Sequence, residues 1–377
     1  MDSGAKKKVL FVIDTLQTGG AEQSLLENTI RFKQLQPVIC HLYPGELLKP
    51  RFIEKGIPVY SVGIQKKYDF RNAGRKLSQI IKTEKPDILV AYLTRSEIVT
   101  RRAGKQNKLP VIGTFVSDLY SKTYNASLSL KAKAAVSYFK LLNKQTGRYC
   151  KGFIANSEAI KRSNARQLGI PLDKIEVINR GRDSKKFTFR VPAVENGKPI
   201  RFLNIGRLVP QKGQRDLILA FKQFLAGHPQ ATLDIAGGGP LKDSLQQLVN
   251  EEGLEKHVTL LGPRNDIPEL INKYDCFVFP SHSEGFSGSV VEAMLAGLPV
   301  LVSNIPVNKE AVTHMQTGYM FEKGSVDDIT KALQWYAGNR TVANEMAGKA
   351  YEHAKENFEL EKIVSRLEDY LQKMISN

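Results

Sequence analysis

The feature that most constrains the fold is an alternation of short apolar segments with amphipathic helical segments, such as 22–34 and 71–83, through most of the 377 residues. This alternation predicts repeated βαβ units and therefore parallel sheets. The strands expected in the first half are Val9–Ile13, Val38–Tyr43, Val59–Val62, Ile88–Ala91, Val111–Phe115, Gly152–Ala155 and Ile175–Ile178. A second series comprises Ile200–Ile205, Thr232–Ala236, Val258–Leu261, Cys276–Phe279 and Val300–Val302.

One polar segment interrupts the alternation and divides the chain. Residues 187–199 (FTFRVPAVENGKP) carry Pro and Gly and read as an interdomain linker. It separates a predicted domain of residues 1–186 from one of residues 200–356, as the chain length favours. The expected class is α/β, with two Rossmann-like doubly wound domains. Side by side, such domains would turn their strand ends and ligand loops toward a shared central cleft.

The charge is distributed unevenly between the two halves. Residues 1–190 hold 36 Lys and Arg against 15 Asp and Glu (+21), whereas residues 191–377 hold 19 against 23 (−4), giving +17. A basic half of this kind suggests that one domain faces an anionic surface. The acid-free stretch 119–157 mixes Lys, Arg, aromatic and aliphatic residues at roughly helical spacing. This predicts an interfacial helix on anionic lipid; the alternative is a helix with one solvated basic face.

The chain has no apolar run of membrane-spanning length, and the run Val9–Ile13 is too short for a signal-peptide core. A cytoplasmic protein is therefore expected. Cys40, Cys150 and Cys276 are few and far apart, which predicts reduced, buried thiols. No HExxH, DxD or Cys/His cluster suggests a metal site, and no nucleic-acid-binding motif accompanies the charge, so nucleic acid is an unlikely partner.

The stretch 280–299 (PSHSEGFSGSVVEAMLAGLP) carries the strongest chemical signal. An apolar strand runs into a Gly-containing turn that starts at Glu284, and Glu292 lies about one turn inside the following helix. The free N–H groups of a helix N-terminus bind anionic oxygens, and carboxylates accept hydrogen bonds from hydroxyls. The combination suits a phosphorylated sugar, although Glu at a helix start can also be a structural cap.

Three more motifs follow predicted strands. Arg207 and Lys212, five residues apart, offer the two cations that a diphosphate leaving group requires. The pair Gly19-Gly20 precedes a predicted helix, and Gly237-Gly238-Gly239 follows another strand. Both would permit close backbone approach to a ligand, but an ordinary tight turn explains either equally well.

Together these segments resemble the large family of retaining GT-B glycosyltransferases (family 4-like, glycosyl transferases group 1). The resemblance lies in IGRLVPQKGQRDLILAF, IAGGGPLKDSLQQL, VTLLGPRNDIPELINKYDCFVFPSHSEGFSGSVVEAMLAGLPVLVS and the early TGGAE. It covers almost all of the second domain and the first more loosely. It implies a GT-B fold, a nucleotide sugar held mainly by the second domain, and no metal or other cofactor. It also implies that a final helix, about 357–377, crosses back to the first domain.

The resemblance assigns roles residue by residue. Arg207 and Lys212 would hold the donor diphosphate, Glu284 the hydroxyls of the transferred sugar, and Glu292 the ribose. Of these, Arg207, Lys212 and Glu284 are the predicted catalytic residues. The remaining donor-binding candidates are Gly19, Gly20, Gly206, Gly238, Arg264, Gly285, Phe286, Ser287, Gly288 and Ser289.

The chain departs from the family pattern at one place. Many members have a His after the strand equivalent to Val111–Phe115, whereas the run here is Val116-Ser117-Asp118. This puts the family's His contact in doubt and leaves Ser117 and Asp118 as acceptor-side candidates. Same-face transfer relies on leaving-group stabilisation and positioning more than on a protein base.

The predicted function is retaining transfer of a hexose from a nucleotide diphosphate sugar, more readily UDP than GDP. The expected acceptor is a lipid-linked or polyanionic glycan of cell-surface polysaccharide synthesis, and the expected location is the inner face of the membrane, held peripherally. Two alternatives remain open: a nucleotide-sugar epimerase on the same scaffold, and a non-catalytic module that binds sugar nucleotide or polyanion.

Overall fold

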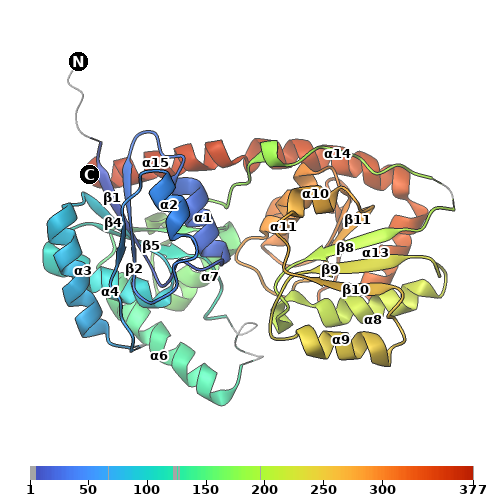
Figure 1. The fold of residues 1–377 in the computed structure, drawn as a ribbon, viewed down its shortest axis with the longest axis horizontal. Coiled ribbons are helices and arrows are strands. Elements are labelled where there is room, and N and C mark those ends of the chain that lie inside the picture. The colour runs from blue at the N-terminus through green and yellow to red at the C-terminus, as the bar shows by residue number, and fades with distance from the viewer. Residues whose placement is uncertain (1–5, 67, 122–124, 126–127, 196, 377) are drawn as a thin grey trace. The chain divides into compact units, whose positions relative to one another are not determined.

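The computed structural model describes residues 6–66, 68–121, 125, 128–195 and 197–376. It consists of two compact units (Figure 1). The first unit comprises Met1–Gly181 together with Leu360–Asn377, and the second comprises Arg182–Glu359. The chain therefore passes between the units twice, at Gly181–Arg182 and at Glu359–Leu360.

The first unit is built on a parallel seven-stranded sheet of order β3-β2-β1-β4-β5-β6-β7. Its central strands are buried on both faces, as expected for a parallel sheet covered by helices. The strands are β1 (Lys8–Ile13), β2 (Gln36–His41), β3 (Val59–Ser61), β4 (Ile88–Ala91), β5 (Val111–Phe115), β6 (Gly152–Ala155) and β7 (Ile175–Val177). The helices are α1 (Gly20–Thr29), α2 (Lys49–Glu54), α3 (Phe70–Glu84), α4 (Thr94–Asn107), α6 (Leu130–Gly147), α7 (Glu158–Leu168) and α15 (Leu360–Ser376).

The second unit holds a parallel six-stranded sheet of order β10-β9-β8-β11-β12-β13. The strands are β8 (Arg201–Ile205), β9 (Thr232–Ala236), β10 (Val258–Gly262), β11 (Cys276–Phe279), β12 (Val300–Ser303) and β13 (Tyr319–Phe321). The helices are α8 (Gln214–Leu225), α9 (Lys242–Glu251), α10 (Ile267–Ile271), α11 (Gly288–Leu295), α12 (Asn308–Ala311), α13 (Val326–Gly338) and α14 (Arg340–Asn357), with the 3₁₀ turn η3 (Pro210–Lys212) between β8 and α8.

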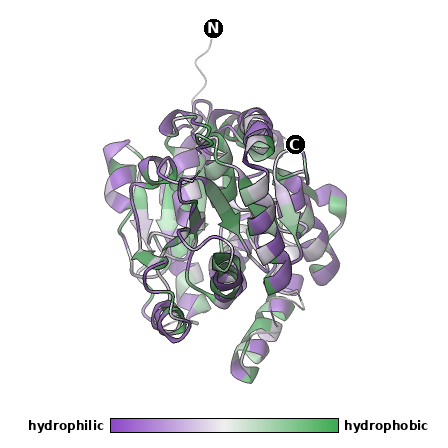
Figure 2. Ribbon diagram, turned by 90° about the vertical axis from the view of Figure 1, so that its right-hand side faces the viewer, coloured by the Kyte–Doolittle hydropathy of each residue, from purple (hydrophilic) through white to green (hydrophobic). Residues whose placement is uncertain are grey.

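Aromatic side chains fill much of the core of the second unit. Phe202 on β8 packs edge-on against Phe221, Phe224 and Tyr336, with ring centroids 5.4–6.0 Å apart. In Figure 2 the central strands carry the hydrophobic colours, whereas the surrounding helices mix hydrophilic and hydrophobic residues. This division agrees with the amphipathic periodicity of the sequence. The predicted α/β class with two doubly wound parallel sheets is confirmed.

One strand and one boundary differ from the expectations. Strand β13, three residues long, is absent from the expected strands and pairs with β12. The segment 187–199, predicted as a linker, packs on the second unit: the Arg190 backbone N–H donates to the Ala296 carbonyl at 2.9 Å, and Phe189 contacts the ring of Tyr351. Backbone carbonyls of this segment also accept side-chain hydrogen bonds from Arg340 and Asn344.

The last helix, α15, belongs to the first unit. Ile363, Leu367 and Leu371 bury one side of it in the core of that unit. Glu368, only 2% exposed, accepts hydrogen bonds at 2.8–3.1 Å from the backbone N–H groups of three consecutive residues, 33–35. A single carboxylate thus fixes the loop between α1 and β2 to the C-terminal helix.

We expect Glu368→Ala to lower the free energy of unfolding by about 2–4 kcal/mol, because three backbone donors lose a charged acceptor. The control is Glu361→Ala on the same helix. The half-exposed Glu361 side chain pairs with Arg31 and Lys33, and its removal should cost under about 1 kcal/mol. Chemical denaturation of both variants measures the difference. Equal losses would contradict the anchoring role of Glu368.

Candidate active site

The order of strands in the second unit creates a switch point at β8. Strand β8 pairs with β9 on one side and with β11 on the other (Figure 1). Beyond them the sheet continues with β10 on the first side and with β12 and β13 on the second. Loops that leave the carboxyl ends of β8 and β11 turn to opposite faces of the sheet. The crevice outside those ends is the usual ligand position in open α/β sheets.

Close backbone contact shapes the loop after β8. The Leu208 N–H donates to the Gly238 carbonyl at 3.0 Å. Gly237 has φ of +149°, and a Cβ there would lie 1.9 Å from the Gly206 carbonyl oxygen. The Gly-rich loop after β9 therefore supports the loop that carries Arg207, which is exposed and whose side chain makes no hydrogen bond or ion pair with the described part of the chain. Gly238 acts here through its carbonyl in the scaffold.

The structure brings Lys212 and Glu284 together at the switch point. Lys212 Nζ lies 2.6 Å from Glu284 Oε1 and 5.0 Å from the centroid of the Phe279 ring. The Glu284 side chain is 9% exposed and that of Lys212 is 21% exposed. The His282 N–H, after β11, donates to the Gln211 carbonyl in η3 at 2.8 Å, which holds the two loops against each other.

The second predicted carboxylate, Glu292, has a partner that the sequence did not indicate. Arg182 Nε donates to Glu292 Oε1 at 2.6 Å, and both side chains are about four-fifths buried. Glu292 lies on α11, which Gly288 opens. No motif marks Arg182, because a basic residue in a basic half of the chain is expected to be solvated. Only the fold shows that it pairs with Glu292.

The turn between the two carboxylates combines core packing with buried polar atoms. Phe286 is 4% exposed and packs on Phe358 at 5.1 Å between ring centroids. The hydroxyls of Ser281 and Ser287 are buried and have no hydrogen-bond partner in the described part of the chain. Gly285 and Ser289 are partly exposed in the same segment. Two unused hydroxyls therefore flank the loop where a polar ligand is expected.

Arg264 does not join this cluster. It follows the edge strand β10 and pairs through two nitrogens with the carboxylate of Asp266, two residues later. The Arg264 side chain is not seen to contact Lys212, Glu284 or Glu292 among the described residues, so its role in donor binding stays a prediction.

The corresponding switch point of the first unit lies between β1 and β4 and is rich in charge. Asp14, after β1, accepts hydrogen bonds from the Ser96 backbone N–H (3.0 Å) and hydroxyl (2.6 Å) and from Arg95 Nη1 (3.2 Å) at the start of α4. Burial raises the pKa of Asp14, although these hydrogen bonds and the charge of Arg95 act to lower it. Leu93, immediately before α4, has φ of +70°, a strained conformation that is concentrated at functional sites.

The predicted Gly19-Gly20 pair lies beside this cluster. The carboxylate of Glu22 lies against Gly19, and the guanidinium of Arg180 lies against Gly20. Burial raises the pKa of Glu22, and the charge of Arg180 opposes that shift. The glycines therefore make room for two charged side chains that belong to the first unit itself.

The acceptor-side candidates anchor a loop of the first unit. Asp118 Oδ1 accepts a hydrogen bond from the Ser163 hydroxyl at 2.5 Å, and the Ser117 carbonyl accepts one from Asn164 Nδ2 at 3.2 Å. Both contacts tie the loop after β5 to α7. Any contact of Ser117 or Asp118 with a substrate remains a prediction.

Helix α6 forms the central part of the predicted basic interfacial segment; residues 122–124, 126 and 127 of that segment lie outside the described part of the chain. Its exposed side carries Leu130, Tyr138 and Leu141 together with lysines. On its buried side, Asn143 accepts from Arg101 Nη1 at 2.6 Å and donates to the Tyr120 hydroxyl at 2.7 Å.

Arg101 is completely buried and lies 2.9 Å from Glu97 on α4. Burial raises the pKa of Glu97 to about 7, although the charge of Arg101 opposes that rise. Helix α6 is therefore held to α4 by a buried polar network rather than by apolar packing alone.

The described residues hold neither a membrane-spanning helix nor a cluster of metal-binding side chains. No helix in that part of the chain combines the length and apolarity needed to cross a membrane. Within the same residues, no three His, Cys, Asp or Glu side chains form a group that could hold a metal ion. Cys40, Cys150 and Cys276 are all buried thiols, and burial raises the pKa of Cys40 to about 12.

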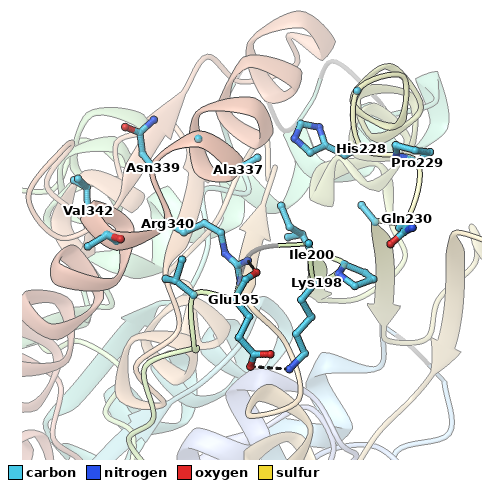
Figure 3. A pocket seen from close by; sticks show the side chains of 17 residues that line it. Glu195, Lys198, Ile200, His228, Pro229, Gln230, Ala337, Asn339, Arg340 and Val342 are labelled. Carbon is cyan, nitrogen blue, oxygen red and sulfur yellow. Dashed lines mark hydrogen bonds and ion pairs between the residues drawn. The ribbon is translucent and has the colours of Figure 1, made fainter.

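A second hollow of the second unit lies at the amino ends of β8 and β9 (Figure 3). It measures about 640 Å³, and of the described residues that line it, none belongs to the predicted donor site. Arg340 extends into it, donates to the Ala193 and Glu195 carbonyls at 3.1 and 3.4 Å, and lies 3.8 Å from Asp275. Its charge is therefore used to hold the segment that precedes β8.

The fold and the paired charges at the β8–β11 switch point define a GT-B glycosyltransferase. Residues 18–186 match the family model Glycosyltransferase Family 4, and residues 185–356 match Glycosyl transferases group 1. The chain belongs to this glycosyltransferase family, which confirms the resemblance to GT-B glycosyltransferases drawn from the sequence motifs.

Curated relatives and a solved structure agree with this assignment. The chain is 28% identical over 315 residues to the Escherichia coli UDP-Gal:alpha-D-GlcNAc-diphosphoundecaprenol alpha-1,3-galactosyltransferase, covering 80% of this chain and 79% of that enzyme. It is 30% identical over 176 residues to a Mycobacterium tuberculosis GDP-mannose-dependent alpha-(1-6)-phosphatidylinositol monomannoside mannosyltransferase, covering 44% and 46%. The crystal structure of Anabaena HepE in complex with UDP has a TM-score of 0.81 at 23% identity, covering 97% of this chain and 100% of that one.

We expect Gly237→Ala to lower the free energy of unfolding by about 2 kcal/mol or more, because a Cβ would meet the Gly206 carbonyl in a conformation that alanine avoids. Gly227→Ala is the matched control, since a Cβ at Gly227 meets open space. Denaturation and nucleotide-binding calorimetry should show loss of stability and weaker UDP binding in the first variant alone. Wild-type behaviour of Gly237→Ala would contradict the supporting role of this loop.

Proposed function

We propose that the chain transfers a hexose from a UDP-sugar to a lipid-linked or polyanionic glycan acceptor, with retained configuration and without a metal ion. The observation that carries the proposal is the Lys212–Glu284 pair at the switch point, with Arg207 exposed on the adjoining loop. Two cations and a carboxylate at one crevice suit a donor with an anionic diphosphate and a neutral, hydroxyl-rich sugar.

In this proposal Arg207 and Lys212 bind the diphosphate and offset the negative charge that develops as it leaves. Glu284 then accepts hydrogen bonds from hydroxyls of the transferred sugar, and Glu292 from those of the ribose. The acceptor oxygen forms its bond to the anomeric carbon on the face from which the diphosphate departs. The acceptor proton passes to the departing diphosphate oxygen, so no protein base is required.

The choice of donor rests on relatives. The Escherichia coli relative uses UDP-Gal, and the Anabaena structure contains UDP, whereas the shorter mycobacterial match is to a GDP-mannose-dependent enzyme. The Escherichia coli relative also acts on a diphosphoundecaprenol-linked sugar, an acceptor whose anionic diphosphate complements a basic first unit. These similarities favour a UDP donor and a lipid-linked acceptor in cell-surface polysaccharide synthesis.

The proposal extends to location: a cytoplasmic enzyme held peripherally on the inner face of the membrane. The exposed apolar and basic side chains of α6 support it, since lysines near a surface attract anionic lipid and exposed Leu and Tyr side chains can enter the headgroup region.

We expect Arg207→Ala and Lys212→Ala each to lower kcat/KM by about 100-fold, the scale of losing one preorganised group that stabilises transition-state charge. The measurement is nucleoside diphosphate release from a panel of UDP- and GDP-sugars, with and without a membrane-lipid extract and in EDTA. Lys222→Ala, which removes a half-exposed lysine on α8, is the control. Near-wild-type rates in either site variant would rule out the diphosphate assignment, and donor conversion without acceptor would indicate an epimerase.

For the membrane surface, the double variant Lys131→Glu/Lys144→Glu should lose most binding to vesicles of phosphatidylcholine and phosphatidylglycerol at low salt. Both lysines are exposed on α6, and each near-surface cation contributes about 1 kcal/mol of attraction. The same charge change at exposed Lys242 and Lys349 in the second unit should leave binding unchanged. A wild-type protein that does not sediment with these vesicles would refute the proposed surface.

A further inference from the structure

Arg182 lies where the chain enters the second unit, and its backbone is held in place there. Its N–H donates to the Phe358 carbonyl at 2.8 Å, and it forms a parallel β-bridge with Glu359, the last residue of that unit. A fixed backbone limits the positions that the side chain can reach. The direction in which the Arg182 side chain leaves the backbone is therefore set by the fold.

The guanidinium covers the first residue of α11. Arg182 Nη2 lies 1.6 Å from the position that a Cβ on Gly288 would occupy, and Cζ lies 2.5 Å from it, while Nε binds Glu292 one turn further along the helix. The absence of a side chain at Gly288 is thus what lets Arg182 reach Glu292. Gly288 is predicted to contact the donor, and in the structure the Arg182 guanidinium lies beside it.

The electrostatics of this arrangement favour an added anion. A cation beside a helix N-terminus is opposed by the helix dipole, and here the carboxylate of Glu292 offsets that repulsion. An anionic group at the same position would be attracted by the free N–H groups of α11 and by the fork of the guanidinium. Lys212 lies at the other end of the same turn, paired with Glu284.

We infer that Arg182 is a further donor-binding residue, which pairs with Glu292 and turns to the donor diphosphate when ribose hydroxyls take its place on Glu292. The inference rests on the proposed function, because it requires a nucleotide diphosphate at the start of α11. Arg182 then acts with Arg207 and Lys212 as a third cation, and it supplies the fork geometry that suits two phosphate oxygens.

The test is isothermal titration of the full-length chain with UDP and with uridine. Arg182→Ala should weaken UDP binding by about tenfold or more, the effect of losing a charged hydrogen bond, and should leave uridine binding equal or tighter. Arg182→Lys should restore part of the loss. The matched control is Arg201→Ala, which should bind UDP normally. Arg201 lies at the amino end of β8, away from the predicted donor site, and is 3.7 Å from Asp275.

Unchanged or tighter UDP binding by Arg182→Ala would overturn the inference while leaving the proposed function intact, because the arginine would then only block the carboxylate. Equal weakening of UDP and uridine would also overturn it, since that result marks a general loss of the site. A wild-type chain that binds neither UDP nor GDP would overturn the proposed function and the inference together.

Gly288→Ala supplies a second measurement. A methyl group there displaces the flexible end of Arg182, so this variant should weaken UDP binding to about the same extent as Arg182→Ala, and the double variant should show little further loss. If Gly288→Ala instead weakens binding equally in the presence and absence of Arg182, the glycine serves the ligand directly and the inference fails.

Discussion

The chemistry of the second unit depends on one constraint, the position of β8 between β9 and β11. Because β8 lies next to β11 in the sheet, the loops that follow these two strands leave the sheet side by side, at the usual ligand position of open α/β sheets. Lys212 and Glu284 are 72 positions apart in the sequence, yet their side chains meet at 2.6 Å where these loops touch. The backbone contact between Gly237 and Gly206 then keeps the Arg207 loop at the same edge. The strand order thus determines which charges can act together.

Each carboxylate at this site is paired with a cation of the chain itself, Glu284 with Lys212 and Glu292 with Arg182. Removing one partner of such a partly buried pair leaves an uncompensated charge, which is costly. In the proposed function a nucleotide sugar would avoid that cost, because its diphosphate would pair with the cations while its hydroxyls pair with the carboxylates. A free phosphate or a neutral sugar offers only half of this exchange, so the pairs themselves favour the complete donor.

The sequence was sufficient for the architecture because strand and helix periodicities follow directly from burial. Glu284, Lys212 and Arg207 could be found because each follows a strand in a loop with a distinctive pattern. Arg182 could not, since it pairs across 110 positions with Glu292 and no local pattern records that contact. The segment 187–199 was misleading for a related reason: its composition suggests solvent, whereas its carbonyls are acceptors for Arg340 and Asn344. Contacts made by backbone atoms leave little trace in residue type.

The net positive charge of the first unit acts on its surroundings over a longer distance than the direct contacts at its β1–β4 switch point. At about 0.1 M salt, exposed charges act over about 10 Å, so the lysines of α6 can attract an anionic surface or acceptor without distinguishing one glycan from another. Discrimination requires buried or partly buried groups in direct contact with the acceptor. Asp14, Arg95 and Glu22 have that character, since they lie at the β1–β4 switch point and burial raises the pKa of both carboxyls. If the proposed function holds, net charge accounts for how an acceptor arrives, and a few polar groups at the carboxyl ends of the first sheet's strands would distinguish one acceptor from another.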